Sequence, residues 1–153
     1  MSDFPLDWQR HWWRLVQDVH RGIPSPDPWK DLPFERYVPL VFEAPHFEPR
    51  HWHFALKDDI PIGFSNLIID PDSSHVALVG VTGVLEAYRR RGLARALKFT
   101  ASLNATAIGV EHIFTENEES NPMLTLNLSL GLFCLFEVFL LIVLESNVLK
   151  VFP

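Results

Sequence analysis

The sequence predicts one mixed α/β domain with a twisted, mainly antiparallel sheet and helices on both faces. Hydrophobic residues make up 48% of the 153 residues and charged residues 21%, which is typical of a single globular domain. Apolar residues recur at helical spacing before residue 51 and at strand spacing after it. From residue 75 to 115, a strand, a helix and a strand follow one another, an order that favours a parallel central pair.

The N-terminal third is expected to be helical. Apolar residues of the stretch 5–20 repeat every three or four positions and predict an amphipathic helix that stops at Gly22. The stretch 23–33 has four prolines, which predicts an ordered loop. A second short helix is expected over 34–43.

The next segment predicts an antiparallel meander. The stretches 51–56 and 60–69 read as strands, and Lys57, Asp58 and Asp59 between them predict a hairpin turn. The stretch 70–74 is expected to be another turn, and it leads into a strand over 75–84.

A helix is predicted over 92–108 with Gly109 as its stop, followed by a strand over 110–115. Its expected buried stripe consists of Leu93, Leu97, Thr100, Ala101, Asn104 and Ile108. Asn121 and Pro122 predict the start of a last helix, which Gly131 should end.

The run 132–144 is the most apolar part of the chain. A membrane-spanning helix needs about 20 apolar residues, whereas this run has 13 and includes Glu137. We therefore expect one or two buried strands, with the turn at 145–147 if there are two. An exposed apolar edge here would favour a homodimer.

Charge and cysteine content exclude several classes of protein. The net charge of −6 disfavours general attraction to nucleic acid or to an anionic membrane. Cys134 is the only cysteine, which rules out an internal disulfide and a cysteine-based zinc site. The N-terminus has no basic start and apolar block, so no signal peptide is expected and the cytoplasm is the predicted location. His51 and His53 share a strand face, but no third ligand is near, so no metal site is expected.

Positive charge gathers at one turn of this acidic chain. A strand-to-helix turn leaves backbone N–H groups free at the helix N-terminus, where the helix dipole favours an anion. Arg89, Arg90 and Arg91 add donors for phosphate, while Gly92 lets a ligand approach the backbone closely. The turn therefore predicts a pyrophosphate site, and the alternative is a solvated run of arginines.

The stretch "VTGVLEAYRRRGLARALK" at 81–98 resembles the acyl-CoA-binding motif of the GNAT superfamily of N-acetyltransferases. Arg89, Gly92 and Ala94 fill the three positions of that motif. The stretch 115–131 resembles the segment that follows it in the family, and its wording is closest to tandem-domain, mycothiol-synthase-like members. The resemblance covers about residues 51–133, with N-terminal helices before it at 1–50 and apolar strands after it at 134–153.

The resemblance implies a splayed sheet near Val84 and a bound acetyl-CoA. Backbone groups of Thr82, Gly83 and Val84 would hold the pantetheine arm, and residues 89–94, which include Leu93, would hold the pyrophosphate. Asn117, Asn121 and Asn127 would lie near the pantetheine or acetyl group. Alternatives stay open: Asn121 can be a helix cap alone, and Thr82 a strand residue without a ligand contact.

The catalytic groups are less clearly marked. Acetyl transfer needs a neutral amine, a polarised thioester carbonyl and a proton for the thiolate. Glu86 is the first choice as base because it follows the central strand, with His75, Glu111 and His112 as other candidates. Asn127 stands where many relatives have a tyrosine that protonates the thiolate, and an asparagine is no practical acid.

The predicted function is transfer of acetyl from acetyl-CoA to a primary amine by direct attack in a ternary complex, with an unknown small-molecule or peptide acceptor. The main alternative is a non-catalytic acyl-CoA-binding or interaction module, such as a degenerate half of a tandem protein. A structural protein without a ligand is the third possibility.

Overall fold

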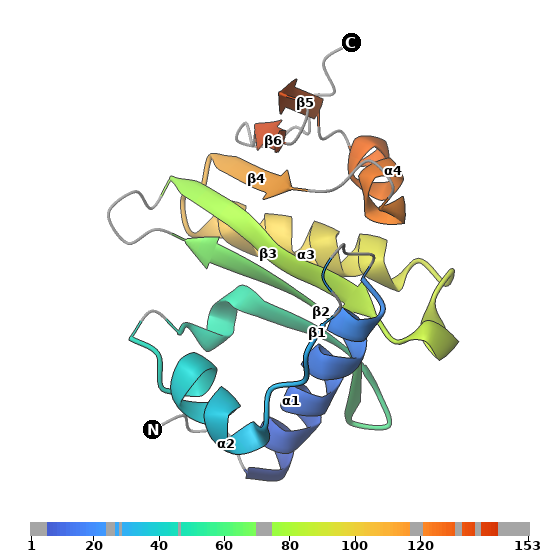
Figure 1. The fold of residues 1–153 in the computed structure, drawn as a ribbon. Helices are drawn as coiled ribbons and strands as arrows, with labels where there is room; N and C mark the ends of the chain where they lie inside the picture. Colours follow the sequence, from blue (N-terminus) through green and yellow to red (C-terminus); the bar gives the residue numbers. More distant parts are fainter. Residues whose placement is uncertain are drawn as a thin grey trace.

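The computed structural model describes residues 6–23, 27, 29–45, 47–69, 75–116 and 121–130, together with the backbone of two strands at 133–136 and 139–143. It confirms the predicted mixed α/β fold. A six-stranded sheet has the order β1-β2-β3-β4-β6-β5, with α1 and α2 on one face and α3 on the other (Figure 1).

The N-terminal helices form as predicted. The first, α1, spans Leu6–Arg21 and buries Trp12, Leu15, Val16 and Val19. The second predicted helix begins as the α-helix α2, Phe34–Tyr37. It continues as a turn of π-helix, η1, over Val38–Phe42. A short 3-10 turn, η2, follows at Pro49–His51.

The meander is also confirmed. The strands are β1 (Trp52–Lys57), β2 (Ile60–Ile69) and β3 (Val76–Val84). Strand β2 pairs antiparallel with β1 on one side and with β3 on the other. Asp58 and Asp59 connect β1 to β2 with φ of 51° and 62°. Two residues with positive φ match the twist of the flanking strands, and aspartate tolerates this geometry better than most residues.

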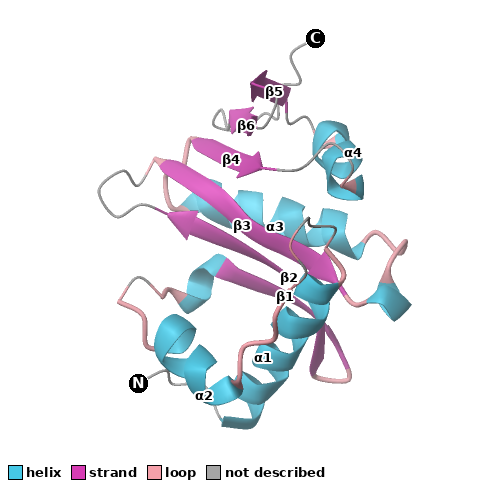
Figure 2. Ribbon diagram, viewed as in Figure 1, coloured by secondary structure: helices cyan, strands magenta, loops and turns pink. Residues whose placement is uncertain are grey.

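The central parallel pair opens along its length. Strand β4, His112–Glu116, pairs with β3 only from Val76 to Leu78, although β3 continues to Val84. Figure 2 shows the two strands diverging from there. The predicted splay is thus present, and it begins at Leu78, six residues before the predicted position.

A bulge in β3 helps to explain the divergence. Ser65 pairs with Thr82 and Leu67 pairs with Val79. Between these two pairs, β2 advances by two residues and β3 by three, so β3 has one extra residue. The Asn66 side chain fills the irregularity, since its Oδ1 accepts the N–H of Val81 at 2.8 Å. An extra residue bends a strand and increases its twist, which turns the end of β3 away from β4.

Helix α3 spans Leu93–Ala107, and Gly109 follows it with φ of 89°. Its buried residues are Leu97, Lys98, Ala101 and Ala105. The predicted stripe was partly wrong, because Thr100, Asn104 and Ile108 are exposed. The helix therefore turns a lysine toward the interior and an isoleucine toward solvent.

The C-terminal elements follow the predicted order. Helix α4, Pro122–Ser129, is capped by Asn121. Strands β5 (Phe133–Phe136) and β6 (Phe139–Val143) pair antiparallel, and β6 pairs with β4. Both strands end before residue 145, and the turn predicted at 145–147 lies outside the described residues. The predicted turn at 70–74, Gly131, and the side chains of 131–153, Cys134 among them, lie outside the described residues.

Each face of the sheet has its own hydrophobic core. Trp12 of α1 is fully buried against the aromatic rings of Phe42, Trp52 and Phe54. On the other face, Ala101 and Ala105 of α3 pack with Leu67, Ala77 and Ile113. Because β2 lies between the two cores, its residues 61–67 are buried without alternation.

Candidate active site

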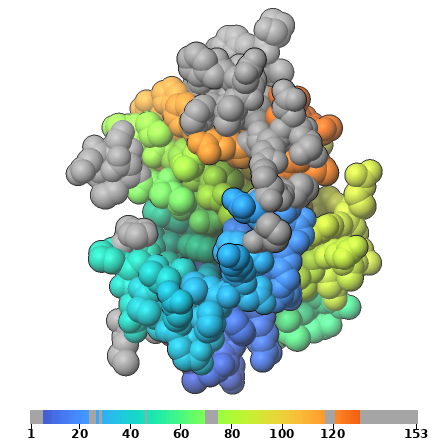
Figure 3. All heavy atoms as spheres, viewed as in Figure 1, coloured from blue at the N-terminus to red at the C-terminus, as the bar shows by residue number. Residues whose placement is uncertain are grey.

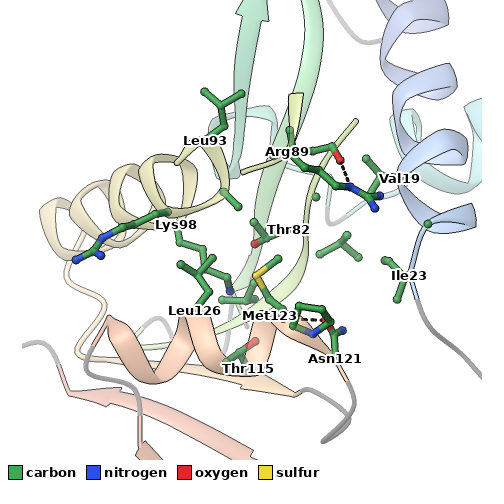
Figure 4. Close-up of a pocket in the computed structure, with 18 of the residues that line it drawn as sticks. Val19, Ile23, Thr82, Arg89, Leu93, Lys98, Thr115, Asn121, Met123 and Leu126 are labelled. Atoms are coloured by element: carbon green, nitrogen blue, oxygen red, sulfur yellow. Dashed lines mark hydrogen bonds between the residues drawn. The ribbon is translucent and has the colours of Figure 1, made fainter. Parts of the chain in front are cut away.

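A cavity of about 1100 Å³ lies where β3 leaves β4. Its walls come from five parts of the chain: the end of α1, residues 79–84 of β3, the turn into α3 with the first part of that helix, the end of β4, and the start of α4. Figure 4 shows these walls, with Val19 and Ile23 facing Met123 and Asn121 across the space. The volume suits a large ligand, since small-molecule pockets are usually about 300 to 1000 Å³.

One end of the cavity is the turn that precedes α3. Gly92 has φ of 80°, and no atom lies within 4 Å of the position where its Cβ would be. The glycine is therefore needed for its conformation, and the space in front of it is open. Gly92, Leu93 and Ala94 all line the cavity, so the N-terminus of α3 faces the interior, as predicted.

The three arginines have different roles. Arg89 donates from Nε to the carbonyl of Val84 at 3.0 Å and packs against Gly22. Figure 3 shows the corresponding surface, where the blue residues of α1 lie beside the yellow-green residues after β3. Arg89 and Arg90 line the cavity. Arg91 lies over the ring of Tyr88 and donates to the carbonyl of Ala87, so its side chain faces away.

The exposed edge of β3 forms a second wall. Leu85 donates its N–H to Ile62 of β2. Because successive residues direct their backbone groups to opposite edges, those of Thr82 and the N–H of Val84 face the gap beside β4, whereas the Val84 carbonyl accepts a hydrogen bond from Arg89. The Thr82 hydroxyl is hydrogen-bonded to Ser65 at 2.8 Å, which leaves its backbone as the group offered to a ligand.

Gly83 has a packing role. A Cβ at this position would lie 2.1 Å from Cγ1 of Val19. The glycine thus allows α1 to approach β3 closely, and both residues line the cavity. The role that the structure shows for Gly83 is this packing, and its part in cofactor binding stays a prediction.

The predicted asparagines are placed differently from one another. Asn121 lines the cavity, and its Oδ1 accepts the N–H of Met123 at 2.9 Å, so it is a helix cap at the cavity wall. Asn127 is fully buried and is not among the residues that line the cavity. Asn117 lies outside the described residues.

The base candidates lie away from the cavity. Glu86 is exposed in the short 3-10 helix η3, Glu86–Tyr88, and contributes nothing to the described wall. His75, Glu111 and His112 lie at the opposite end of β3, where His75 and Glu111 are 3.6 Å apart. The structure thus brings together most of the predicted cofactor residues at one cavity, but not Arg91 and not these four base candidates.

His20 is a wall residue that the sequence analysis missed. Its ring stacks on Trp29 with centroids 4.1 Å apart, and burial lowers its pKa. Trp29 also donates to Gln17 at 3.1 Å, and the same Gln17 oxygen accepts the N–H of Leu32. No sequence pattern marks His20, because its position depends on how the proline-rich loop returns to α1.

Lys98 was also missed, although a signal exists. It is 5% exposed and lines the cavity, and burial lowers its pKa to about 8. Leu97, Ala101 and Ala105 lie at helical spacing, so Lys98 falls on the apolar face of α3. A lysine within such a stripe is unusual, since buried lysines are rare unless they are paired.

Neither a metal-binding cluster nor a membrane-spanning helix is present among the described residues. Within them, no group of three or more histidine, cysteine, aspartate or glutamate side chains could hold a metal ion. His53 is instead within hydrogen-bond distance of Asn104, at 2.7 Å. In the same part of the chain, no helix is both long and apolar enough to cross a membrane.

Comparisons with known proteins agree with this geometry. The sequence model described as "Acetyltransferase (GNAT) family" matches residues 7–124. No curated protein matches the chain. Several solved structures share the fold at low identity, and three are described next.

The ribosomal-protein-alanine N-acetyltransferase from Brucella melitensis has a TM-score of 0.73 at 13% identity, over 92% of this chain and 97% of that one. The ribosomal-protein-S18-alanine N-acetyltransferase from Escherichia coli has a TM-score of 0.64 at 17% identity, over 97% of both chains. Diaminobutyrate acetyltransferase from Paenibacillus lautus, in complex with its substrate and coenzyme A, has a TM-score of 0.58 at 18% identity, over 87% of this chain and 86% of that one.

Proposed function

The chain belongs to the GNAT acetyltransferase family, and from this premise we propose that it transfers acetyl from acetyl-CoA to a primary amine. The observation that carries the proposal is the cavity itself. It joins an anion-binding turn at Gly92 to an open strand edge at Val84. A cofactor with a pyrophosphate at one end and a hydrogen-bonding arm at the other fits this shape.

The proposed binding mode follows the walls. Backbone N–H groups at the start of α3 hold the pyrophosphate, and the Arg90 guanidinium adds charge. The pantetheine arm runs along the gap, where Thr82 and Val84 offer backbone groups. The same backbone polarises the thioester carbonyl for direct attack by the amine in a ternary complex.

Calorimetric titration with acetyl-CoA tests the site. A Gly92→Glu variant adds a side chain and a negative charge at the turn, so we expect loss of measurable binding. Gly109→Glu is the matched control, because Gly109 is also a left-handed glycine with open space around it but does not line the cavity. Equal loss in both variants, or none in either, would contradict the proposed site.

We propose His20 as the group that removes a proton from the amine. It faces the cavity from α1, and its lowered pKa keeps the imidazole neutral at pH 7. In a panel of amines, His20→Phe should lose about 100-fold in turnover and keep acetyl-CoA affinity, since the stack on Trp29 is retained. His75→Phe should change neither turnover nor acetyl-CoA affinity. If His75→Phe loses turnover and His20→Phe keeps it, His75 is the base and the proposal for His20 is wrong.

The rival function is a module that binds acetyl-CoA without turnover. The same panel separates the two, because saturable binding with no CoA release for any amine would favour the rival. The resemblance to tandem-domain members also stays a proposal. If the chain is folded but does not bind acetyl-CoA by itself, the result would favour a cofactor site that requires a second domain.

Two other expectations are kept as proposals. The cytoplasmic location rests on the single cysteine, which fits a reducing compartment. The homodimer rests on the apolar C-terminal run and on the place of β5 at the end of the sheet order. An unpaired strand edge is a common site of association between chains.

A further inference from the structure

Lys98 is a buried cation that faces the cavity without a counter-charge. Its side chain is 5% exposed, and within the described part of the chain no hydrogen bond or ion pair to it is present. Figure 4 shows the side chain leaving α3 toward Leu126 and Met123 of α4. A lysine held in this way is costly for folding, so a role with a ligand would explain its position.

The position of Lys98 is at the deep end of the cavity. It also borders a very small cavity whose walls include Ser65 and Val79, and Val79 directly follows the last residue that pairs with β4. Val79 and Val84 are five strand residues apart, or about 16 Å. A cofactor that enters at the Gly92 turn and follows β3 inward therefore brings its far end, the thioester, toward Lys98.

We propose that Lys98 is the acid that protonates the CoA sulfur when the thioester breaks. This inference rests on the proposed function. The amine nitrogen bonds to the acetyl carbon, the C–S bond breaks, and the electron pair leaves on sulfur. Lys98 gives one N–H proton to that sulfur and becomes neutral. His20 takes the proton that the new amide nitrogen loses, and a proton returns from His20 to Lys98 through water, so both groups end the cycle as they began and the protons balance.

The chemistry of the group fits this role. Burial lowers the pKa of Lys98 to about 8, close to the value of about 8.5 for a cysteine thiol, so proton transfer to a thiolate of similar basicity is nearly balanced. The wall that faces it from α4 is apolar, and β3 and β4 present Thr82 and Thr115. The other charged or titratable groups of the described wall are His20, Tyr88, Arg89, Arg90, Arg95 and Glu116.

The test uses CoA alone and needs no acceptor. Thiolate has an ultraviolet absorption that thiol lacks, so titration of the protein with CoA at pH 7 reports the state of the bound sulfur. A free thiol with a pKa of about 8.5 is about 3% thiolate at this pH, and free CoA measured alone gives the reference value. With the protonated lysine beside it, bound CoA should show at least a tenfold larger thiolate fraction.

Three variants sharpen the result. Lys98→Met should bind CoA by calorimetry but lose the thiolate signal. Lys98→Arg should keep the signal, because arginine stays charged, yet lose turnover with amines, because it cannot release the proton. Lys30→Met removes an exposed lysine that does not line the cavity and should keep the signal.

The outcomes separate this inference from the proposed function. If CoA binds and Lys98→Met shows the same sulfur state as the parent chain, Lys98 is not the acid. Full turnover in Lys98→Arg would also overturn the proposal, since charge alone would then suffice. If the folded parent chain binds neither CoA nor acetyl-CoA, the proposed function fails first, and the inference fails with it.

Discussion

At the scale of single residues, neighbours in sequence have different roles in the cavity wall. Arg90 and Arg91 are adjacent and both lie in the predicted pyrophosphate motif, yet only Arg90 lines the cavity. Arg90 has φ of 62°, a left-handed conformation that turns the chain sharply before α3. The direction of each side chain, and not its presence in the motif, decides which arginine can contact a phosphate.

This difference gives a prediction for paired variants. Arg90→Ala should weaken acetyl-CoA binding about tenfold, as expected for loss of one charge-assisted hydrogen bond of about 1.5 kcal/mol. Arg91→Ala should change affinity less than twofold, because its guanidinium contacts Tyr88 and the Ala87 carbonyl. Calorimetry at one fixed salt concentration measures both, and equal losses would show that the two side chains share the phosphate.

At the scale of elements, the cavity depends on how closely α1 approaches β3. Val19 and Gly83 are in contact at this approach, and each also forms part of the wall. A side chain at Gly83 would push α1 outward and move His20 with it. The helix is thus both a support for the aromatic core and a wall of the site.

A double-mutant cycle tests that contact. Gly83→Ala should destabilise the protein by about 1 to 3 kcal/mol, the usual cost of overpacking, because its Cβ would overlap the Val19 side chain. In the Val19→Ala background the same change should cost much less, since the overlapping methyl group is gone. Urea denaturation gives the four free energies of unfolding, and additive effects would mean that the two residues are not coupled.

The elements themselves were largely predictable, because they depend on local patterns. Alternation predicted the meander, and Asp58 and Asp59 predicted its turn. The stripe of α3 was misread after Ala101 because Asn104 and Ile108 occur at helical spacing but face solvent. The ends of β5 and β6 were not predicted, because an almost uniformly apolar run gives no periodic signal to mark where a strand ends.

At the scale of the whole molecule, the buried lysine should make stability depend on pH. An unfolded lysine binds its proton up to about pH 10.5, whereas folding lowers the pKa of Lys98 to about 8. Between these values the unfolded chain binds more protons, so the free energy of unfolding should rise with pH. Below pH 8 both states are protonated, and the full cost of burying the charge remains.

Removal of that charge should therefore stabilise the fold. At pH 7, Lys98→Met is expected to raise the free energy of unfolding by up to about 3 kcal/mol and to flatten its rise between pH 8 and 10. Urea denaturation at several pH values measures this. The exposed Lys30→Met serves as control and should leave the curve unchanged, while a destabilised Lys98→Met would show that the amine has a favourable partner in the fold.

The sequence by itself determined the class of fold, the order of its elements and the glycine-arginine turn, because each depends on residues close together in the chain. Only the tertiary structure decided which groups meet at the cavity. His20 reaches it from α1, Lys98 from α3 and Asn121 from α4, while Glu86 and His75 do not. Their meeting depends on the Gly83 contact, the bulge at Asn66 and the divergence of β3 from β4, and packing between distant segments leaves no periodic trace in a sequence.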